Sequence, residues 1–317
     1  YWNHRMFLLH GQSKYIDVME RSLYNSVISG VSLDGTRFFY PNPLESDGTY
    51  ERSEWFGCAC CPGNITRFLA SVSGYVYAVR DQAIYVNLFG QSEASLEVSG
   101  KKVLLTQKTQ FPWDGKVVMD VSPEADSGRF TLKIRIPDWA TDSFSSSDLY
   151  TFTEPLRQPM TVQVNNEHVP LKTVDGYVSL DRIWNQGDTV SVDLPMPVRQ
   201  IVCDERVKDN VGKIALQRGP LVYCIEWPDV EGGRVLHLVL DKEAPLEIAQ
   251  RPDLLGGVTV IKGTAVELTQ KDDGAVHKTP RRFEAIPYYA WAHRGKGQMA
   301  VWIPVPSMTE EVGSDQP

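Results

Sequence analysis

Residues 130–136 read Phe-Thr-Leu-Lys-Ile-Arg-Ile, and this stretch decides the fold class. Apolar and polar residues alternate along it, which is typical of a β-strand with one buried face. Similar strands are predicted at residues 84–89, 116–121, 160–164, 189–194, 213–225, 235–240, 258–261 and 299–303. Turn signals such as Asn165-Asn166 and Gln186-Gly187-Asp188 separate them. Short strands at this spacing indicate antiparallel sandwiches rather than a parallel sheet, with Trp139 and Trp184 at least partly buried.

Towards the N-terminus the apolar period changes from two residues to about 3.6. Ser13 is predicted to cap one helix, and Gly11 suits the end of a helix before it. A further helix is predicted to begin at Asn64, and its apolar stripe runs from Ile65 to Tyr75. The long segment 30–63 between them is rich in Gly, Pro, Asn and Asp, and loops of such length are usually functional.

These patterns predict a mainly β protein with an N-terminal α part. Residues 1–80 form the helical part, and residues 81–317 form a β-sandwich region of two modules. The helical part is too small to bury its own apolar faces, so we expect it to belong to a larger helical domain. The chain opens inside a helical pattern, which reads as an internal point of a longer protein. The tail 307–317 is polar, and we expect it to be frayed.

Charge and hydropathy exclude several partners. The formal net charge of the 317 residues is −8, and the basic runs are short, which argues against nucleic acid. No apolar run approaches the roughly 20 residues of a membrane span. A neutral or weakly polar small substrate fits this composition better.

The least random feature of the sequence is the turn Cys58-Ala59-Cys60-Cys61-Pro62-Gly63-Asn64. Three of the five cysteines fall within four residues, just before a predicted helix N-terminus that favours thiolate over thiol. Thiolates are good zinc ligands, and the remaining ligands must come from elsewhere. Packing without a metal stays open for this cluster, and a strained disulfide between Cys60 and Cys61 is a weaker alternative.

Other candidate residues favour structural roles. Cys203 and Cys224 are isolated, and buried packing is the usual role of such cysteines. None of the six histidines shows ligand spacing with another. Asn64-Ile65-Thr66 matches a glycosylation sequon but is better explained as a helix start. Glu45 can serve a site in the long loop, although a structural role is favoured.

Two stretches together make a family recognisable. Phe38-Phe39-Tyr40-Pro41-Asn42-Pro43-Leu44-Glu45 and Trp55-Phe56-Gly57-Cys58-Ala59-Cys60-Cys61-Pro62-Gly63-Asn64 resemble the bacterial β-L-arabinofuranosidases of glycoside hydrolase families 127 and 146. Tyr24-Asn25, Ser32-Leu33-Asp34-Gly35 and Gln217-Arg218-Gly219-Pro220-Leu221-Val222-Tyr223 are similar to the same family.

The resemblance implies the last helices of an (α/α) barrel, followed by jelly-roll-like sandwiches. It also implies a retaining hydrolase in which Cys60 is both the catalytic nucleophile and a zinc ligand, Cys61 is a second zinc ligand, and Tyr40 contacts the sugar. In the family a Glu and a Cys complete the zinc site from a segment that precedes the part matched here. The acid/base Glu lies earlier still, so that N-terminal barrel segment is an implied partner.

Two functions therefore follow from the sequence. The first is a zinc-dependent hydrolase that releases β-L-arabinofuranose, or a related furanosyl sugar, from plant-type glycans. The second is a non-catalytic protein with a structural zinc site, whose sandwiches bind carbohydrate or a partner domain. Exposed rows of Trp113, Trp139, Trp184 or Trp291 would favour the second.

Overall fold

The computed structural model describes residues 1–124, 127–142, 144, 147–270 and 274–306. The predicted frayed tail 307–317 lies outside these residues. The chain folds into two compact units, each built from several chain segments. Residues 1–23, 66–147 and 155–197 form the first, and residues 24–65, 148–154 and 198–317 form the second.

The α-helices lie within residues 2–71, and all strands except β1 (Glu45–Asp47) follow from Tyr77 onwards. The helical segments are α1 (Trp2–His10), α2 (Ser13–Arg21), the π-helix η1 (Ser22–Val27), α3 (Cys60–Ser71) and the 3-10 helix η2 (Val72–Tyr75). Gly11 ends α1 in the left-handed conformation, as predicted, because glycine adopts that conformation without steric cost. Ser13 is the first helical residue of α2 rather than its cap, since Gln12 occupies the cap position and makes no side-chain cap bond.

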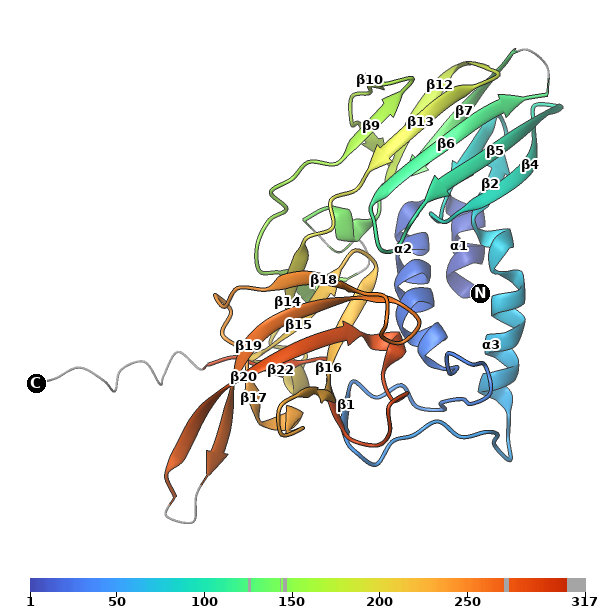
Figure 1. Cartoon of the computed structure of the whole chain (residues 1–317). Helices are drawn as coiled ribbons and strands as arrows, with labels where there is room; N and C mark the ends of the chain where they lie inside the picture. Colours follow the sequence, from blue (N-terminus) through green and yellow to red (C-terminus); the bar gives the residue numbers. More distant parts are fainter. Residues whose placement is uncertain (125–126, 143, 145–146, 271–273, 307–317) are drawn as a thin grey trace, which may run out of the picture. The chain divides into compact units, whose positions relative to one another are not determined.

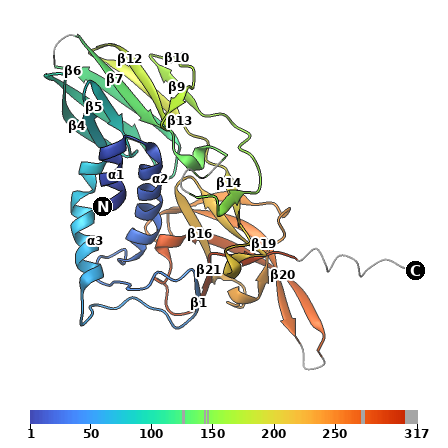
Figure 2. The ribbon, with the colours of Figure 1, turned by 180° about the vertical axis from the view of Figure 1, so that it is seen from behind.

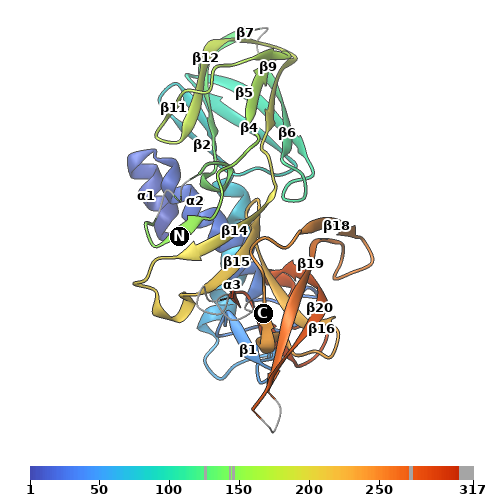
Figure 3. The ribbon, with the colours of Figure 1, turned by 90° about the vertical axis from the view of Figure 1, so that its left-hand side faces the viewer.

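The first unit contains two sheets, seen as two layers in Figure 3. The six-stranded sheet has the order β10 (Glu167–His168), β9 (Thr161–Val164), β13 (Asp188–Asp193), β6 (Lys116–Pro123), β5 (Lys101–Thr109) and β4 (Ser92–Val98). The five-stranded sheet has the order β11 (Thr173–Val174), β12 (Tyr177–Asn185), β7 (Ser127–Arg135), β3 (Ala83–Val86) and β2 (Tyr77–Arg80). Every strand pair of this unit is antiparallel except β3 with β7.

The alternation of apolar and polar residues along the strands explains which side chains form the core of the first unit. On β7 the apolar residues Phe130, Leu132 and Ile134 are buried, as the period of two requires, while Arg135 at the end of the strand is buried out of this period. Trp184 on β12 is fully buried and stacks on Phe130 at 5.8 Å between ring centroids. Trp139 is also buried, so the predictions for both tryptophans are confirmed.

A buried ion-pair cluster joins α2 to β7 within this unit. Arg135 donates to Asp17 Oδ1 at 2.6 Å and to Glu20 Oε1, and its Nε donates to the Asn87 carbonyl. Trp139 Nε1 donates to the second oxygen of Glu20 at 2.8 Å. Figures 1 and 2 show α1 and α2 side by side, next to the sheets of this unit.

The second unit is organised around one 11-stranded sheet. Its central path is β17 (Leu238–Val239), β19 (Val258–Gln270), β20 (Val276–Pro287), β16 (Leu221–Val230), β15 (Lys213–Arg218), β14 (Val198–Cys203) and β8 (Tyr150–Phe152). Three further strands pair with this path: β18 (Glu247–Arg251), β21 (Gln298–Ala300) and β22 (Ile303–Pro304), and β1 (Glu45–Asp47) pairs with β21. Short 3-10 helices complete both units: η3 (Asp138–Ala140), η4 (Lys208–Asn210), η5 (Val235–His237) and η6 (Tyr288–Ala290).

The expected mainly β fold with a helical N-terminal part is confirmed, with antiparallel sheets predominating. The division at residue 80 and the two sandwich modules stay predictions. The strand predicted at 235–240 is wrong in its first half, because Val235 and Leu238 are buried at a spacing of three, which suits the 3-10 turn η5. Among the described residues, none of the helices is both long and apolar enough to cross a membrane.

Candidate active site

The Cys turn forms the beginning of α3. The helix starts at Cys60, four residues before the predicted start at Asn64, so Cys60 and Cys61 lie in its first turn. Pro62 is compatible with this position, because the first-turn N–H groups have no intrahelical acceptor. Asn64 does not cap the helix; its side-chain amide donates back to the Cys60 carbonyl at 2.9 Å.

The two adjacent sulfurs face the same side of this turn. Cys60 Sγ and Cys61 Sγ are 3.9 Å apart, and both residues are free thiols. The disulfide alternative is therefore not present. Two thiolates bound to one tetrahedral zinc, each at about 2.3 Å, place their sulfurs roughly 3.8 Å apart. The observed spacing fits two of the four positions around such an ion.

Tyr40, in the long loop 30–63, lies next to Cys60 and Cys61. Its hydroxyl lies 3.2 Å from Cys60 Sγ and also donates to the Cys58 carbonyl. Phe56 packs edge-on against the Tyr40 ring, with 4.5 Å between the centroids. The structure thus brings together Tyr40, Cys60 and Cys61, the three site residues named from the sequence, although 20 residues separate Tyr40 from Cys60.

Hydrogen bonds and burial shift the pKa values of the two thiols in opposite directions. The Tyr40 hydroxyl, followed by the Cys61 thiol, lowers the pKa of Cys60. Desolvation, followed by the bond with Cys60, raises the pKa of Cys61. The bond with Cys60 also raises the pKa of the Tyr40 phenol. Cys60 is therefore the more readily ionised thiol, as a nucleophile requires.

The remaining metal ligands are not supplied nearby. Within the described part of the chain no group of three His, Cys, Asp or Glu residues is arranged to hold a metal ion. Cys224 is buried in β16, and burial raises its pKa, while Cys203 Sγ donates to the Val207 carbonyl. Both are packed, as predicted. Glu45 lies in β1 opposite Ala300, and its exposed carboxylate is 3.7 Å from Lys213 Nζ.

The tryptophans named for a binding surface do not form one. Trp139, Trp184 and Trp291 are each at most 4% exposed. Trp113 alone of the four is partly accessible. The exposed row that would favour a non-catalytic carbohydrate-binding protein is therefore not made by these residues.

Sequence reasoning missed the residue that anchors the long loop. Arg52 is 4% exposed, and its guanidinium donates to the carbonyls of Ser29 at 2.9 Å and Trp291 at 2.7 Å. It lies over the Phe39 ring at 4.4 Å, and Phe39 stacks on Trp291. No local pattern marks a lone arginine for this role, because its acceptors lie up to 240 positions away along the chain.

Comparison with known proteins places these features in one family. Residues 1–74 match the model of the β-L-arabinofuranosidase GH127 catalytic domain. Residues 83–196 match the GH127 middle domain, and residues 198–304 match the glycoside hydrolase family 127 C-terminal domain. The matched catalytic segment includes Tyr40, Cys60 and Cys61.

Individual relatives agree with these models. The chain is 34% identical over 324 residues to a non-reducing end β-L-arabinofuranosidase of Bifidobacterium longum subsp. longum, covering 94% of this chain and 46% of the relative. A solved structure described as a GH127 β-arabinofuranosidase superposes with a TM-score of 0.91 at 44% identity, covering 96% of this chain and 48% of that one. A GH127 β-L-arabinofuranosidase from Geobacillus stearothermophilus T6 gives a TM-score of 0.86 at 40% identity, with the same coverage of 96% and 48%.

The chain spans about half the length of the relatives it matches. Its three domain matches nevertheless follow one another along nearly the whole sequence, and all belong to one family. The chain belongs to glycoside hydrolase family 127.

Proposed function

We propose that the protein is a retaining glycoside hydrolase that releases β-L-arabinofuranose, or a related furanosyl sugar, from plant-type glycans. One observation carries the proposal: Cys60 shares the first turn of α3 with a second thiol and is hydrogen-bonded by Tyr40. The relatives described as β-L-arabinofuranosidases support the substrate class.

Cys60 is the proposed nucleophile. Its sulfur attacks the anomeric carbon, the glycosidic C–O bond breaks, and the leaving oxygen takes a proton from a carboxylic acid. Water then attacks the same carbon, the C–S bond breaks, and the carboxylate accepts the proton of the water. Two displacements at one carbon retain its configuration. By the family resemblance, the carboxylic acid belongs to the preceding barrel segment.

Cys60 and Cys61 are the residues that would hold zinc in this chain, since their sulfur spacing fits a shared ion. Bound zinc would keep the Cys60 sulfur deprotonated and oriented, and would favour its departure as a thiolate. The resemblance assigns the two other ligand positions to a Glu and a Cys of the preceding segment.

Tyr40 is proposed to orient the nucleophile and to contact the sugar. Its hydroxyl has a single proton and two neighbours, the Cys60 sulfur and the Cys58 carbonyl. With Cys60 as a thiolate, the proton is best placed towards the sulfur, because a charged acceptor makes the stronger hydrogen bond. This bond holds the hydroxyl next to the position that the anomeric carbon must take.

The test uses this chain joined to the catalytic-domain segment that its relatives carry, assayed on an aryl β-L-arabinofuranoside. Cys60→Ser should lower kcat by roughly 10⁴-fold or more, as loss of a nucleophile does in other covalent mechanisms. Cys203→Ser is the matched control, because that thiol only packs against the Val207 carbonyl. Wild-type turnover by Cys60→Ser would remove Cys60 from the role of nucleophile.

A further inference from the structure

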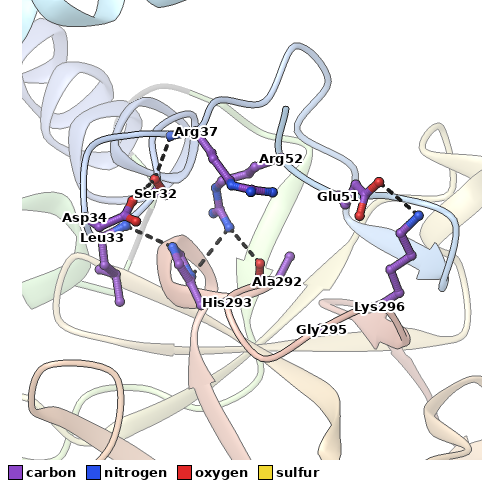
Figure 4. Close-up of a pocket in the computed structure, with 10 residues that line it drawn as sticks. All are labelled: Ser32, Leu33, Asp34, Arg37, Glu51, Arg52, Ala292, His293, Gly295 and Lys296. Carbon is purple, nitrogen blue, oxygen red and sulfur yellow. Dashed lines mark hydrogen bonds and ion pairs between the residues drawn. The ribbon is translucent and has the colours of Figure 1, made fainter. Parts of the chain in front are cut away.

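A second concave region lies in the unit that also contains the long loop. A cavity of about 520 Å³ opens between segments 32–37, 51–52 and 292–296 (Figure 4). This volume falls within the range of small-molecule sites. Its charged and titratable lining residues are Asp34, Arg37, Glu51, Arg52, His293 and Lys296. Neither Tyr40 nor the cysteines line it, so the proposed catalytic chemistry does not use this space.

Arg52 gives the cavity wall a positive charge. It is buried, and burial lowers its pKa to about 10, so it is still a cation near neutral pH. Its N–H groups bond to main-chain carbonyls, including those of Ser29 and Trp291. In the described part of the chain no carboxylate lies within ion-pair distance of it. The charge of Glu226 raises the pKa of Arg52, but Glu226 is itself ion-paired with Arg294 at 2.6 Å. An anion in the cavity would therefore further reduce the cost of burying Arg52.

Two further cations, Arg37 and Lys296, line the cavity, and each is in an exposed ion pair that a ligand can replace. Arg37 pairs with Glu54 at 3.2 Å, and Lys296 pairs with Glu51 at 2.9 Å. All four side chains are more than half exposed to water. Such surface pairs contribute little stability, so a ligand competes easily for their donors.

The other two titratable groups are already satisfied. Asp34 accepts from the Ser32 hydroxyl and from the N–H and hydroxyl of Thr36; these bonds lower its pKa to about 2. His293 Nε2 accepts from the Leu33 N–H at 3.0 Å, so its proton lies on Nδ1, which faces the Ala290 carbonyl at 2.8 Å. Burial, followed by the charge of Arg52, lowers the pKa of His293 and keeps the ring neutral.

We propose that this cavity binds an acidic sugar unit, with the ligand carboxylate attracted by Arg37 and Arg52 and the sugar hydroxyls taken by Glu51 and Lys296. Arg37 supplies the planar pair of N–H donors that matches a carboxylate. Arg52 supplies charge rather than free N–H groups. The choice of a sugar rests on the proposed function, because a hydrolase of plant-type glycans meets further sugar units in its substrates, and the choice of an acidic one rests on the three cations of the lining.

The test measures ligand binding by isothermal titration calorimetry. The complete protein, meaning this chain joined to the catalytic-domain segment that its relatives carry, has the substitution Cys60→Ser so that no substrate is hydrolysed. The probes are D-galacturonate, its neutral counterpart D-galactose, and acetate. Galacturonate should bind, with an affinity that falls as NaCl is raised, while galactose and acetate should bind at least tenfold more weakly. Arg37→Ala should weaken galacturonate binding roughly 10- to 100-fold, the range of a charge-assisted hydrogen bond.

Arg129→Ala is the matched control, because Arg129 is an exposed arginine in an ion pair of the first unit. Lys296→Ala is a second test of the rim and should weaken galacturonate binding as well. Equal binding of galactose, or wild-type affinity in both Arg37→Ala and Lys296→Ala, would refute the site. If acetate binds as tightly as galacturonate, the cavity recognises a carboxylate but no sugar, which would overturn the proposal. Because hydrolysis is not measured, a negative result would leave the proposed catalytic role of Cys60 untouched.

Discussion

Replacing Arg135 with methionine should destabilise the first unit more than replacing an exposed arginine with methionine. Arg135 is completely buried, and its partners Asp17 and Glu20 have side chains that are each 1% exposed. Methionine has a similar length but leaves both carboxylates buried without a cation. Breaking a buried ion pair in this way costs about 3–5 kcal/mol. For a unit of this size that corresponds to a fall in Tm of roughly 6–20 °C.

The measurement is thermal and urea denaturation followed by circular dichroism, with Arg129→Met as the control. Arg129 lies on the same strand, and its pair with Asp181 is exposed on both sides, so its loss should cost at most about 1 kcal/mol. Neutralising the orphaned carboxylates, by adding Asp17→Asn and Glu20→Gln to Arg135→Met, should restore part of the loss. Equal stability of Arg135→Met and Arg129→Met would refute the reasoning.

Four other predictions concern the core, pH, zinc and completeness of the catalytic unit. Trp184→Ala should cost about 3–5 kcal/mol, while Ile183→Ala, on the exposed side of the same strand, should change stability by less than about 0.5 kcal/mol in urea denaturation. Burial, followed by a neighbouring guanidinium, lowers the folded-state pKa of His293. The unfolded state therefore binds the proton more tightly, and wild type should lose stability relative to His293→Gln as the pH falls below about 6.5. Cys61→Ser should lower zinc content, measured by mass spectrometry of the metal, in the complete protein. The 317-residue chain alone should show little glycosidase activity, because lack of the acid by itself costs roughly 10²–10⁴-fold; turnover comparable to that of the complete protein would contradict this.

The strands were predictable because their signal is local, and the candidate site was predictable because the resemblance names its residues. The alternation of residues 130–136 predicts a buried face, and the observed burial follows it up to Ile134, after which Arg135 is buried as well. The resemblance linked Tyr40 to Cys60, and the structure places their side-chain atoms 3.2 Å apart. The Gly219-Pro220 turn, by contrast, divides the predicted strand 213–225 into β15 and β16.

The start of α3 and the roles of Arg52 and His293 were not predictable. The start of α3 was placed at Asn64, because an asparagine before an apolar stripe usually caps a helix. Here the helix continues back through Pro62 to Cys60, and the Asn64 amide bonds within the helix. Arg52 and His293 were overlooked for another reason: they meet only after folding, since 241 positions separate them along the chain.

The most direct test of the central claim is to identify the residue that carries the sugar during turnover. The complete protein would be mixed with an aryl β-L-arabinofuranoside, quenched with acid within the first turnovers and digested for peptide mass spectrometry. We expect one added pentosyl unit on the sulfur of Cys60 and none in Cys60→Ser. An adduct on a carboxylate, or a product released with inverted anomeric configuration, would contradict it.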